Sequence, residues 1–211
     1  KDVLVREGLV LYFPFENISS FGESSKVVCD YSGNGRAGFV EGATWVKAGG
    51  INNSGAFAFD GINDYIAILT NKSLSPSTTG KFSVSLWIKP FELNFSGQSA
   101  SNPYVNFIGK EDAQEGYEWN FRMYNISNQY NRSSRMSFYL FNISGGFGSG
   151  SYVQESLSVN KWVHLVGVFN GTDIFLWKNG VLKDITPLSQ YGIRPQYGLA
   201  PFRIGTSEGS A

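Results

Sequence analysis

The sequence predicts an all-β fold, either a sandwich or a barrel, and three observations support this. About a dozen short apolar runs, rich in β-branched and aromatic residues, are separated by turn signals. No window sustains the i, i+3, i+4, i+7 apolar repeat of an amphipathic helix. Aromatic residues make up 16% of the chain and glycines number 25, a combination typical of many strands joined by tight turns. At 211 residues, the chain fits a single domain of this class.

Two strands and a loop stand out before the last third of the chain. The apolar run Gly8–Phe15 predicts an opening strand, with Pro14 near its end, where a missing backbone N–H is tolerated. The segment Phe82–Lys89 alternates apolar and polar residues, which predicts a strand with one core-facing side. The glycine-rich segment Gly145–Gly150 predicts a loop, because it has few side chains to pack. The core-facing side of the central strand carries Phe82, Val84, Leu86 and Ile88.

The last third of the chain predicts a three-stranded antiparallel meander. Its strands are expected at residues 162–169, 174–177 and 181–184. Asn170-Gly171 and Lys178-Asn179-Gly180 separate them. Asn-Gly supplies the positive φ angles that a tight hairpin turn requires. These turns therefore predict that neighbouring strands pair directly.

The charge balance argues against two classes of partner. The chain has 17 basic and 17 acidic residues, and they are scattered without a basic patch, so nucleic acid is not an expected partner. No apolar run approaches the roughly 20 residues that a membrane span needs, so no span is expected in this chain. Cys29 is the only cysteine, which leaves no disulfide framework.

Eight N-glycosylation sequons, Asn-x-Ser/Thr, occur in the chain, whereas its composition predicts roughly three by chance. One explanation is a bias toward Asn and Ser. The other is a glycan-coated protein, because a bulky glycan must sit outside the fold. The second explanation predicts an extracellular or cell-surface location. The sequons are at Asn17, Asn52, Asn71, Asn94, Asn125, Asn131, Asn142 and Asn170.

Six motifs follow one another along residues 8–206. They are GLVLYFPFE from Gly8, DYSGNG from Asp30, GATW from Gly42, AFDGINDYI from Ala58, FSVSLWIKP from Phe82, and KWVHLVG from Lys161 with LWKNG from Leu176. Their order resembles laminin-G-like domains of the concanavalin A-like lectin/glucanase superfamily. The resemblance implies a two-sheet antiparallel β-sandwich (a concanavalin A-like jelly roll) over residues 8–211. It also implies glycan recognition or adhesion, with one structural calcium ion in many members.

One departure from the family concerns the last strand. These domains normally continue past residues 202–205 into a further strand with an acidic sequence, which is missing here. A missing strand would leave an unpaired edge and an open groove in the sandwich. Either the chain is truncated, or another segment fills the groove. Residues 1–7, an N-terminal extension that includes Asp2–Arg6, are a candidate donor strand for a neighbouring subunit.

The resemblance places a candidate calcium site at Glu16, Asp30 and Asn34. Calcium takes clusters of oxygen ligands from carboxylates, amides and backbone carbonyls. The alternative is that Asp30 and Asn34 only shape a turn, through side-chain bonds to backbone N–H groups. For Asp60 and Asp64, the turn-shaping role is the expected one.

Aromatic side chains are the candidates for stacking on sugar rings. Three tryptophans in predicted strands are expected in the core: Trp87, Trp162 and Trp177. His164 is also expected in the core. Aromatics expected in loops are the better candidates, although the sequence alone names no sugar ligand. These are Tyr104, Tyr117, Tyr130, Tyr152 and Tyr197.

The sequence does not predict an enzyme. Glycoside hydrolases need two carboxylates across a cleft, which on a strand requires acids at i and i+2 or i+4. Instead, Glu111, Asp112 and Glu115 lie in a turn-like stretch, and Glu118 is alone beside Trp119. The expected function is a non-catalytic extracellular carbohydrate-binding or adhesion module of a glycosylated surface protein. The alternative is a structural subunit of an extracellular filament or sheath, a homo-oligomer in which neighbouring subunits exchange strands.

Overall fold

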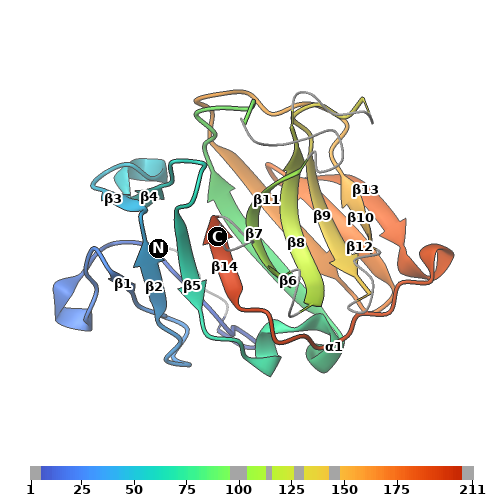
Figure 1. Ribbon diagram of the computed structural model, residues 1–211, viewed down its shortest axis with the longest axis horizontal. Coiled ribbons are helices and arrows are strands. Elements are labelled where there is room, and N and C mark those ends of the chain that lie inside the picture. The colour runs from blue at the N-terminus through green and yellow to red at the C-terminus, as the bar shows by residue number, and fades with distance from the viewer. Residues whose placement is uncertain (1–5, 96–103, 113–115, 126–130, 143–147, 206–211) are drawn as a thin grey trace.

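The computed structural model describes residues 6–95, 104–112, 116–125, 131–142 and 148–205. These residues form two antiparallel sheets packed face to face, which confirms the predicted β-sandwich (Figure 1). The large sheet has the strand order β1-β2-β5-β14-β7-β8-β9-β10, and the small sheet has the order β13-β12-β11-β6. Strands β3 and β4 form a separate pair.

The strands are β1 (Val27–Val28), β2 (Gly38–Glu41), β3 (Thr44–Val46), β4 (Ala56–Ala58), β5 (Tyr65–Ile68), β6 (Phe82–Ile88), β7 (Tyr104–Asp112), β8 (Gly116–Tyr124), β9 (Met136–Phe141), β10 (Gly148–Tyr152), β11 (Val163–Phe169), β12 (Asp173–Lys178), β13 (Val181–Pro187) and β14 (Phe202–Gly205). The α-helix in the described residues is the single turn α1 (Pro76–Thr79). Short 3₁₀ segments lie at Ser19–Phe21, Ile51–Asn53, Lys72–Leu74 and Leu188–Tyr191. None of the described helices is long and apolar enough to cross a membrane.

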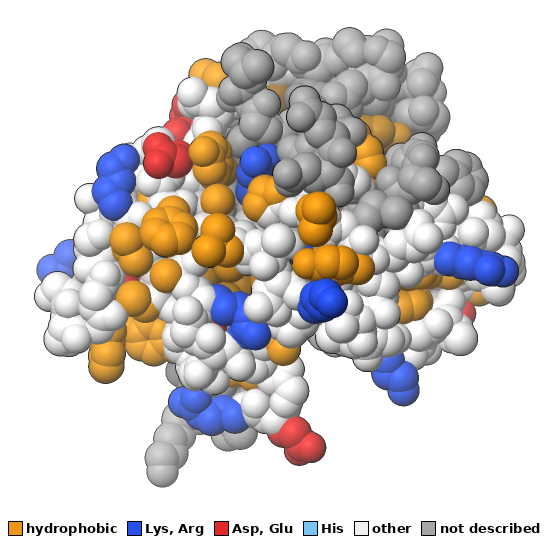
Figure 2. Space-filling model, turned by 60° about the horizontal axis from the view of Figure 1, so that its bottom comes forward, with side chains coloured by type: hydrophobic (Ala, Val, Ile, Leu, Met, Phe, Trp, Pro, Cys, Tyr) orange, Lys and Arg blue, Asp and Glu red, His pale blue; other side chains and the backbone are white. Residues whose placement is uncertain are grey.

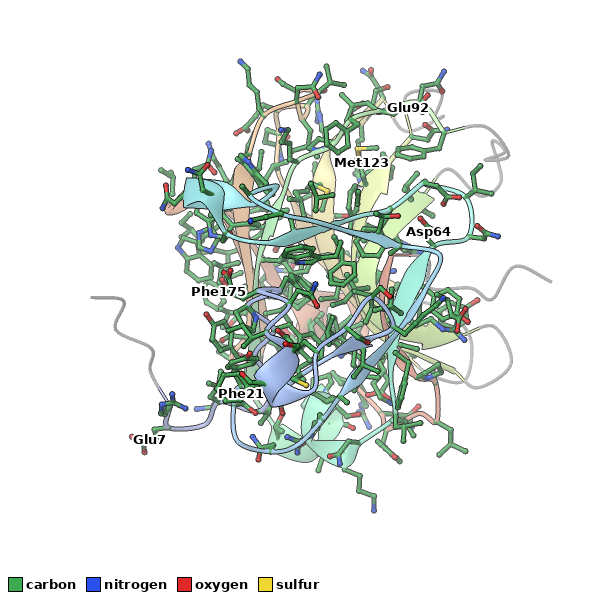
Figure 3. All side chains as sticks on the ribbon, turned by 90° about the vertical axis from the view of Figure 1, so that its left-hand side faces the viewer. Glu7, Phe21, Asp64, Glu92, Met123 and Phe175 are labelled. Carbon is green, nitrogen blue, oxygen red and sulfur yellow. The ribbon has the colours of Figure 1, made fainter. Side chains whose placement is uncertain are left out.

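The core lies between the two sheets because alternate side chains of each strand point inward. Strand β8 contributes Trp119, Phe121 and Met123, all of which are buried. In Figure 3, Met123 lies between the two layers, whereas Phe175 lies on the outside of the small sheet. The Phe121 ring stacks on Phe138 of β9 with a centroid distance of 4.6 Å. Full burial of each such side chain stabilises the fold by about 2–3 kcal/mol.

The predicted meander is confirmed. Strands β11, β12 and β13 are consecutive antiparallel neighbours, and β6 pairs with the other side of β11. At the β12–β13 turn, Asn179 has a φ of 51° and Gly180 a φ of 77°, the positive values expected for this hairpin.

The predicted opening strand is not observed. Residues 8–15 are not part of a β-ladder, although the Tyr31 N–H donates to the Tyr12 carbonyl at 2.9 Å. Val10, Leu11 and Phe13 still pack against the core. The segment ends at Phe15, whose φ of 60° is incompatible with an extended strand. The apolar pattern therefore marks a core contact rather than a sheet partner.

Strand β6 forms one end of the small sheet, and its inward side is less covered than that of its neighbour. Phe82, Val84, Leu86 and Ile88 all face the core, as predicted, but remain half-buried. The inward residues of β11 are fully buried. Among the described strands, β6 pairs only with β11, so its other edge has no described partner strand.

The outside of the molecule shows no single charged region on the side turned forward in Figure 2. Hydrophobic side chains form several separate groups there, and Lys and Arg side chains lie between them.

Candidate functional site

The outer face of the large sheet carries a cluster of aromatic and arginine side chains over β7–β10. Since Trp119, Phe121 and Met123 of β8 point inward, the alternate residues Arg122 and Tyr124 point outward. In Figure 1 the large sheet lies in front of the small one, so this face is turned toward the viewer. We call this cluster the aromatic–arginine face. It consists of Tyr104, Tyr117, Arg122, Tyr124, Arg132, Tyr139, Phe141 and Tyr152.

Arg122 is the centre of the face. Its guanidinium carbon lies 3.7 Å from the ring centroid of Tyr104 and 3.8 Å from that of Tyr139. Phe141 lies further away, at 5.4 Å. Only 9% of Arg122 is exposed. A desolvated cation over an aromatic ring is stabilised by about 2 kcal/mol, so the rings hold this charge in place.

A second arginine joins the same phenol groups. The hydroxyls of Tyr124 and Tyr139 lie 3.1 Å apart, and Arg132 donates an N–H to the Tyr124 hydroxyl at 3.0 Å. The Arg132 guanidinium also lies 4.1 Å from the Tyr152 ring centroid. Burial raises the pKa of Tyr124 well above its ordinary value. Burial opposes charge on Arg132, but its hydrogen bond to Tyr124 raises the Arg132 pKa. The face therefore combines neutral phenols with two permanent positive charges.

Amide groups continue the face toward β7. Asn120 is 1% exposed, and its side-chain nitrogen donates to Asn106 Oδ1 at 3.0 Å and to a carboxylate oxygen of Glu111. Asn120 Oδ1 has no hydrogen-bond partner among the described residues. Polar groups of this kind fix orientation in ligand sites lined by aromatic rings.

Glycines of β10 make room for the rings. The expectation that Gly145–Gly150 forms a loop is wrong from Gly148 onward, where β10 begins. A Cβ at Gly148 would lie 2.3 Å from the Phe141 ring, and one at Gly150 would lie 2.5 Å from the Tyr139 ring. Glycine therefore serves here as a strand residue beside large aromatic neighbours.

The structure places three of the expected loop tyrosines on strands of this face, so their assignment to loops is corrected. Tyr104 contacts Tyr124 at a centroid distance of 5.1 Å, and Tyr117 contacts Phe141 at 5.7 Å. Tyr152 lies under Arg132. Two candidates lie elsewhere: Tyr197 packs over Lys110 at 4.9 Å, and Tyr130 lies outside the described residues.

Sequence reasoning missed Arg122 and Tyr139, which contact each other at the centre of the face. A signal was present, because Arg122 stands between the inward residues Phe121 and Met123 of an apolar strand. Since side chains alternate along a strand, that position predicts an outward arginine on the sheet.

The expectation that Trp87, Trp162, Trp177 and His164 lie in the core is wrong. Trp87 is 47% exposed and stacks on His164 at a centroid distance of 4.8 Å on the outer face of the small sheet. Trp162 and Trp177 are half-buried, and Trp177 stacks on Phe175 at 5.6 Å. The physical reason is alternation, because the neighbouring Leu86 and Ile88 already face inward.

His164 belongs to the same outer surface. Its Nε2 lies 2.8 Å from the Ser85 hydroxyl, and its ring borders a shallow apolar hollow beside Val166, Val168 and Trp177. Partial burial lowers the pKa of His164. No described carboxylate or cysteine joins it in a cluster of three or more potential metal ligands.

The expected calcium ligands are held by other bonds. Asp30 and Asn34 lie in one turn and both bond to Ser32, whereas the Glu16 carboxylate accepts the N–H of Gly55 at 3.4 Å. Both oxygens of Asp30 accept from N–H or O–H groups, and the Asn34 amide nitrogen points at backbone carbonyls. These residues do not fit a calcium ion in this arrangement. The calcium site stays a prediction, which chelation tests.

Asp60 and Asp64 shape a turn. Asp60 Oδ1 accepts the N–H groups of Ile62, Asn63 and Asp64, and Asp64 Oδ2 accepts the N–H of Asp60. Backbone hydrogen bonds, foremost that from Ile62, lower the pKa of Asp60.

Glu118, which the sequence left alone, pairs with Lys110. Both side chains are fully buried, and the ion pair also bonds to the backbone of Gly198. The other acid near the sheet, Glu111, bonds to Asn120. Glu118 and Glu111 therefore both form contacts that hold the sheet together.

One sequon asparagine is buried. Asn125 is 1% exposed, and its side-chain nitrogen donates to the Phe95 carbonyl at 3.0 Å. A glycan would attach to this nitrogen, so occupancy at Asn125 requires modification before folding or local opening. The other sequons stay predictions. Their asparagines are exposed or half-buried at Asn17, Asn52, Asn71, Asn94, Asn131, Asn142 and Asn170.

Comparison with solved structures supports the fold. Domain 4 of AbnA, an extracellular arabinanase from Geobacillus stearothermophilus solved in complex with arabinotriose, matches with a TM-score of 0.59. It is 16% identical over 84% of this chain and 77% of that domain. The receptor-binding domain of botulinum neurotoxin D matches with a TM-score of 0.61 and 18% identity. That match covers 87% of this chain but 43% of the toxin domain, so this chain spans less than half of it.

Comparison at the level of sequence gives the family. A search of curated protein sequences found no match. The family model of the concanavalin A-like lectin/glucanases superfamily named Laminin_G_3 matches residues 59–211, well over half of the chain. The matched region includes both sheets' central strands and the whole aromatic–arginine face. The chain therefore belongs to the Laminin_G_3 family of this superfamily.

Proposed function

We propose that this chain is a non-catalytic glycan-binding module, and that sugars bind on the aromatic–arginine face. The observation that carries the proposal is the array of half-buried tyrosine rings on one side of β7–β10, namely Tyr104, Tyr117, Tyr139 and Tyr152. Aromatic rings give large apolar contact areas to sugar faces, while the neighbouring amides supply hydrogen bonds. The sequon-rich composition supports an adhesion role on an extracellular, glycosylated surface protein.

Two further observations support binding rather than catalysis. Glycoside hydrolysis needs two carboxylates on either side of the scissile bond. On the described part of the face, the acid is Glu111, which already accepts a hydrogen bond from Asn120. The structural neighbours with TM-scores near 0.6 include a domain solved with a bound oligosaccharide and a receptor-binding domain.

A glycan array with matched tyrosine variants tests the proposal. Tyr139→Ala removes a central ring, so binding of any retained glycan should weaken at least tenfold, or about 1.4 kcal/mol. Tyr12→Ala removes a tyrosine that is 38% exposed in the N-terminal segment beside Tyr31, outside the aromatic–arginine face, and should leave binding unchanged. Thermal melting of both variants shows that they fold. An array on which the wild-type chain binds nothing contradicts the proposal.

The open edge at β6 favours a second candidate, a structural subunit whose neighbours exchange strands. A long edge strand with half-buried apolar residues is a template for an added strand. The candidate donor, residues 1–7, includes residues 1–5, which lie outside the described residues. An added strand would cover the inward row of β6 and satisfy its free backbone edge.

Electron microscopy of the native protein separates the two candidates. Filaments that disappear on Leu4→Pro, which removes a backbone N–H from the donor segment, would support strand exchange. Leu4→Val is the matched control, because valine retains the N–H and favours extended backbone. A protein that remains monomeric and still binds glycans argues against assembly.

A further inference from the structure

The Arg122 guanidinium is a nearly buried charge, with 9% of the residue exposed. Among the described residues, no carboxylate lies within ion-pair distance of it, and its Nε has no hydrogen-bond partner. Its contacts are the rings of Tyr104, Tyr139 and Phe141. Taking a charge out of water costs several kcal/mol, and the rings offset only part of that. Among the described residues, no anion balances this charge.

The rings also determine how an anion would approach. Tyr104 and Tyr139 come from β7 and β9, the strands on either side of β8, so they contact the guanidinium from opposite sides. Stacked rings occupy the two faces of the guanidinium plane. The N–H groups project from the edge of this plane, and such an edge matches the two oxygens of a carboxylate or sulfate.

Charges around Arg122 also favour an anion. Arg132 adds a second positive charge, connected to the Arg122 ring stack by the Tyr124–Tyr139 hydroxyl contact. Among the described side chains on this side, the acid is Glu111, which accepts from Asn120, and the ion pairs of the described residues do not join it to Arg122. Glu118 is on the inner side, paired with Lys110.

We propose that the glycan bound on the aromatic–arginine face is acidic, and that its carboxylate or sulfate group binds the edge of the Arg122 guanidinium. The inference rests on the proposed function and specifies its ligand class. The sugar rings contact the half-buried tyrosine side chains, and the anionic substituent supplies a counter-charge to Arg122. A charge-assisted hydrogen bond in a desolvated site makes affinity depend strongly on this one group.

Calorimetry with matched probes tests the ligand class. The first pair is oligogalacturonate and the same oligosaccharide with its carboxyl groups reduced to alcohols. The second pair is dextran sulfate and dextran of equal length. We expect the wild-type chain to bind at least one acidic probe about 10- to 100-fold more tightly than its neutral counterpart. Whichever pair shows the difference identifies the preferred anion.

Substitutions at Arg122 test the site. Arg122→Gln should remove the preference for the acidic probe, and Arg122→Lys should retain only part of it, because lysine lacks the planar fork. Arg6→Gln is the matched control, since Arg6 is exposed near Tyr31 at the opposite end of the molecule. If Arg122→Gln fails to fold, Arg122→Lys and the wild-type comparison still decide the question.

The outcomes separate this inference from the proposed function. Equal binding of acidic and neutral probes, lost on Tyr139→Ala, overturns the acidic-ligand inference and leaves glycan binding intact. An acidic preference that survives in both Arg122 variants overturns the assignment to Arg122. Binding of no glycan at all overturns the proposed function, and the inference falls with it.

Discussion

The Asp30 carboxylate illustrates how one side chain organises the N-terminal part of the chain. It accepts hydrogen bonds from the N–H groups of Tyr12 at 3.0 Å, Ser32 at 2.8 Å and Arg36 at 3.2 Å, and from the Ser32 hydroxyl. Partial burial alone would raise the pKa of Asp30, but the hydrogen bonds from Ser32, Tyr12 and Arg36 outweigh it and lower that pKa. The carboxylate therefore stabilises the fold at neutral pH.

We predict that Asp30→Asn lowers the free energy of unfolding by about 1–3 kcal/mol at pH 7, because an amide accepts fewer of these bonds. The measurement is urea unfolding. A lowered pKa adds stability above the ordinary Asp pKa of about 4, and this is lost as pH falls through the folded value. The difference between wild type and variant should therefore shrink below pH 4. Glu92→Gln, at an exposed position, is the control.

Chelation tests the calcium expectation at the same residues. Because the oxygens of Asp30 face N–H and O–H donors, EDTA should leave the melting temperature unchanged. A fall of several degrees on chelation, reversed by added calcium, would show that this turn rearranges around an ion.

Among the elements, β11 shows how tightly the two sheets approach. Gly167 is buried and faces β8 and β9 across the core. A Cβ there would lie 2.5 Å from the Phe138 ring and 2.8 Å from the Phe121 ring. Glycine thus allows the stacked phenylalanine pair to fill the centre of the sandwich.

We predict that Gly167→Ala destabilises the fold by about 1–3 kcal/mol, because overpacking forces the two rings to shift. Urea unfolding measures the change. Ser83→Ala, on the exposed side of β6, should change stability by less than about 0.5 kcal/mol. Equal effects of the two substitutions would argue against this packing.

For the whole molecule, the Lys110–Glu118 ion pair connects the sheet to the segment that leads into β14. Lys110 donates to the Gly198 carbonyl at 2.7 Å, and Glu118 accepts the Gly198 N–H at 2.9 Å. Tyr197 packs over the Lys110 ammonium. One buried pair thereby fixes chain segments that are about 80 residues apart in sequence.

We predict that Lys110→Met costs about 3–5 kcal/mol, because it leaves the buried Glu118 carboxylate unpaired. The double variant Lys110→Met/Glu118→Met should recover much of this loss, since it removes both charges. Urea unfolding of both variants and of wild type gives the three free energies. If the double variant is as unstable as the single variant, the attraction between the two charges contributes more to the free energy of unfolding than the cost of burying them.

Local patterns made much of the fold predictable. The β11–β13 meander follows from Asn-Gly turns between apolar runs, and the inward row of β6 follows from its alternation. The same alternation places Trp87 outside, although its size suggested the core. The strand predicted at residues 8–15 and the loop predicted where β10 begins are both wrong. Apolar or glycine-rich composition does not reveal whether a neighbouring strand is present.

The candidate site was predictable only in part. As tyrosines, Tyr104, Tyr117 and Tyr152 are predicted to stack on sugar rings, and they do lie on one face. Nothing local shows that Tyr104 and Tyr139 flank Arg122. That arrangement depends on the register of β7, β8 and β9, which pairs Asn106 with Arg122 and Ser137 with Arg122.

The sequence by itself determined the all-β class, the hairpin turns and the family, because these depend on residue periodicity and short-range backbone preferences. Tertiary structure decided which strands became neighbours, where β14 inserted between β5 and β7, and which side chains faced outward together. The physical reason is that sheet pairing joins residues far apart in the chain. That no described acid pairs with the nearly buried Arg122 is visible only from the arrangement of its spatial neighbours.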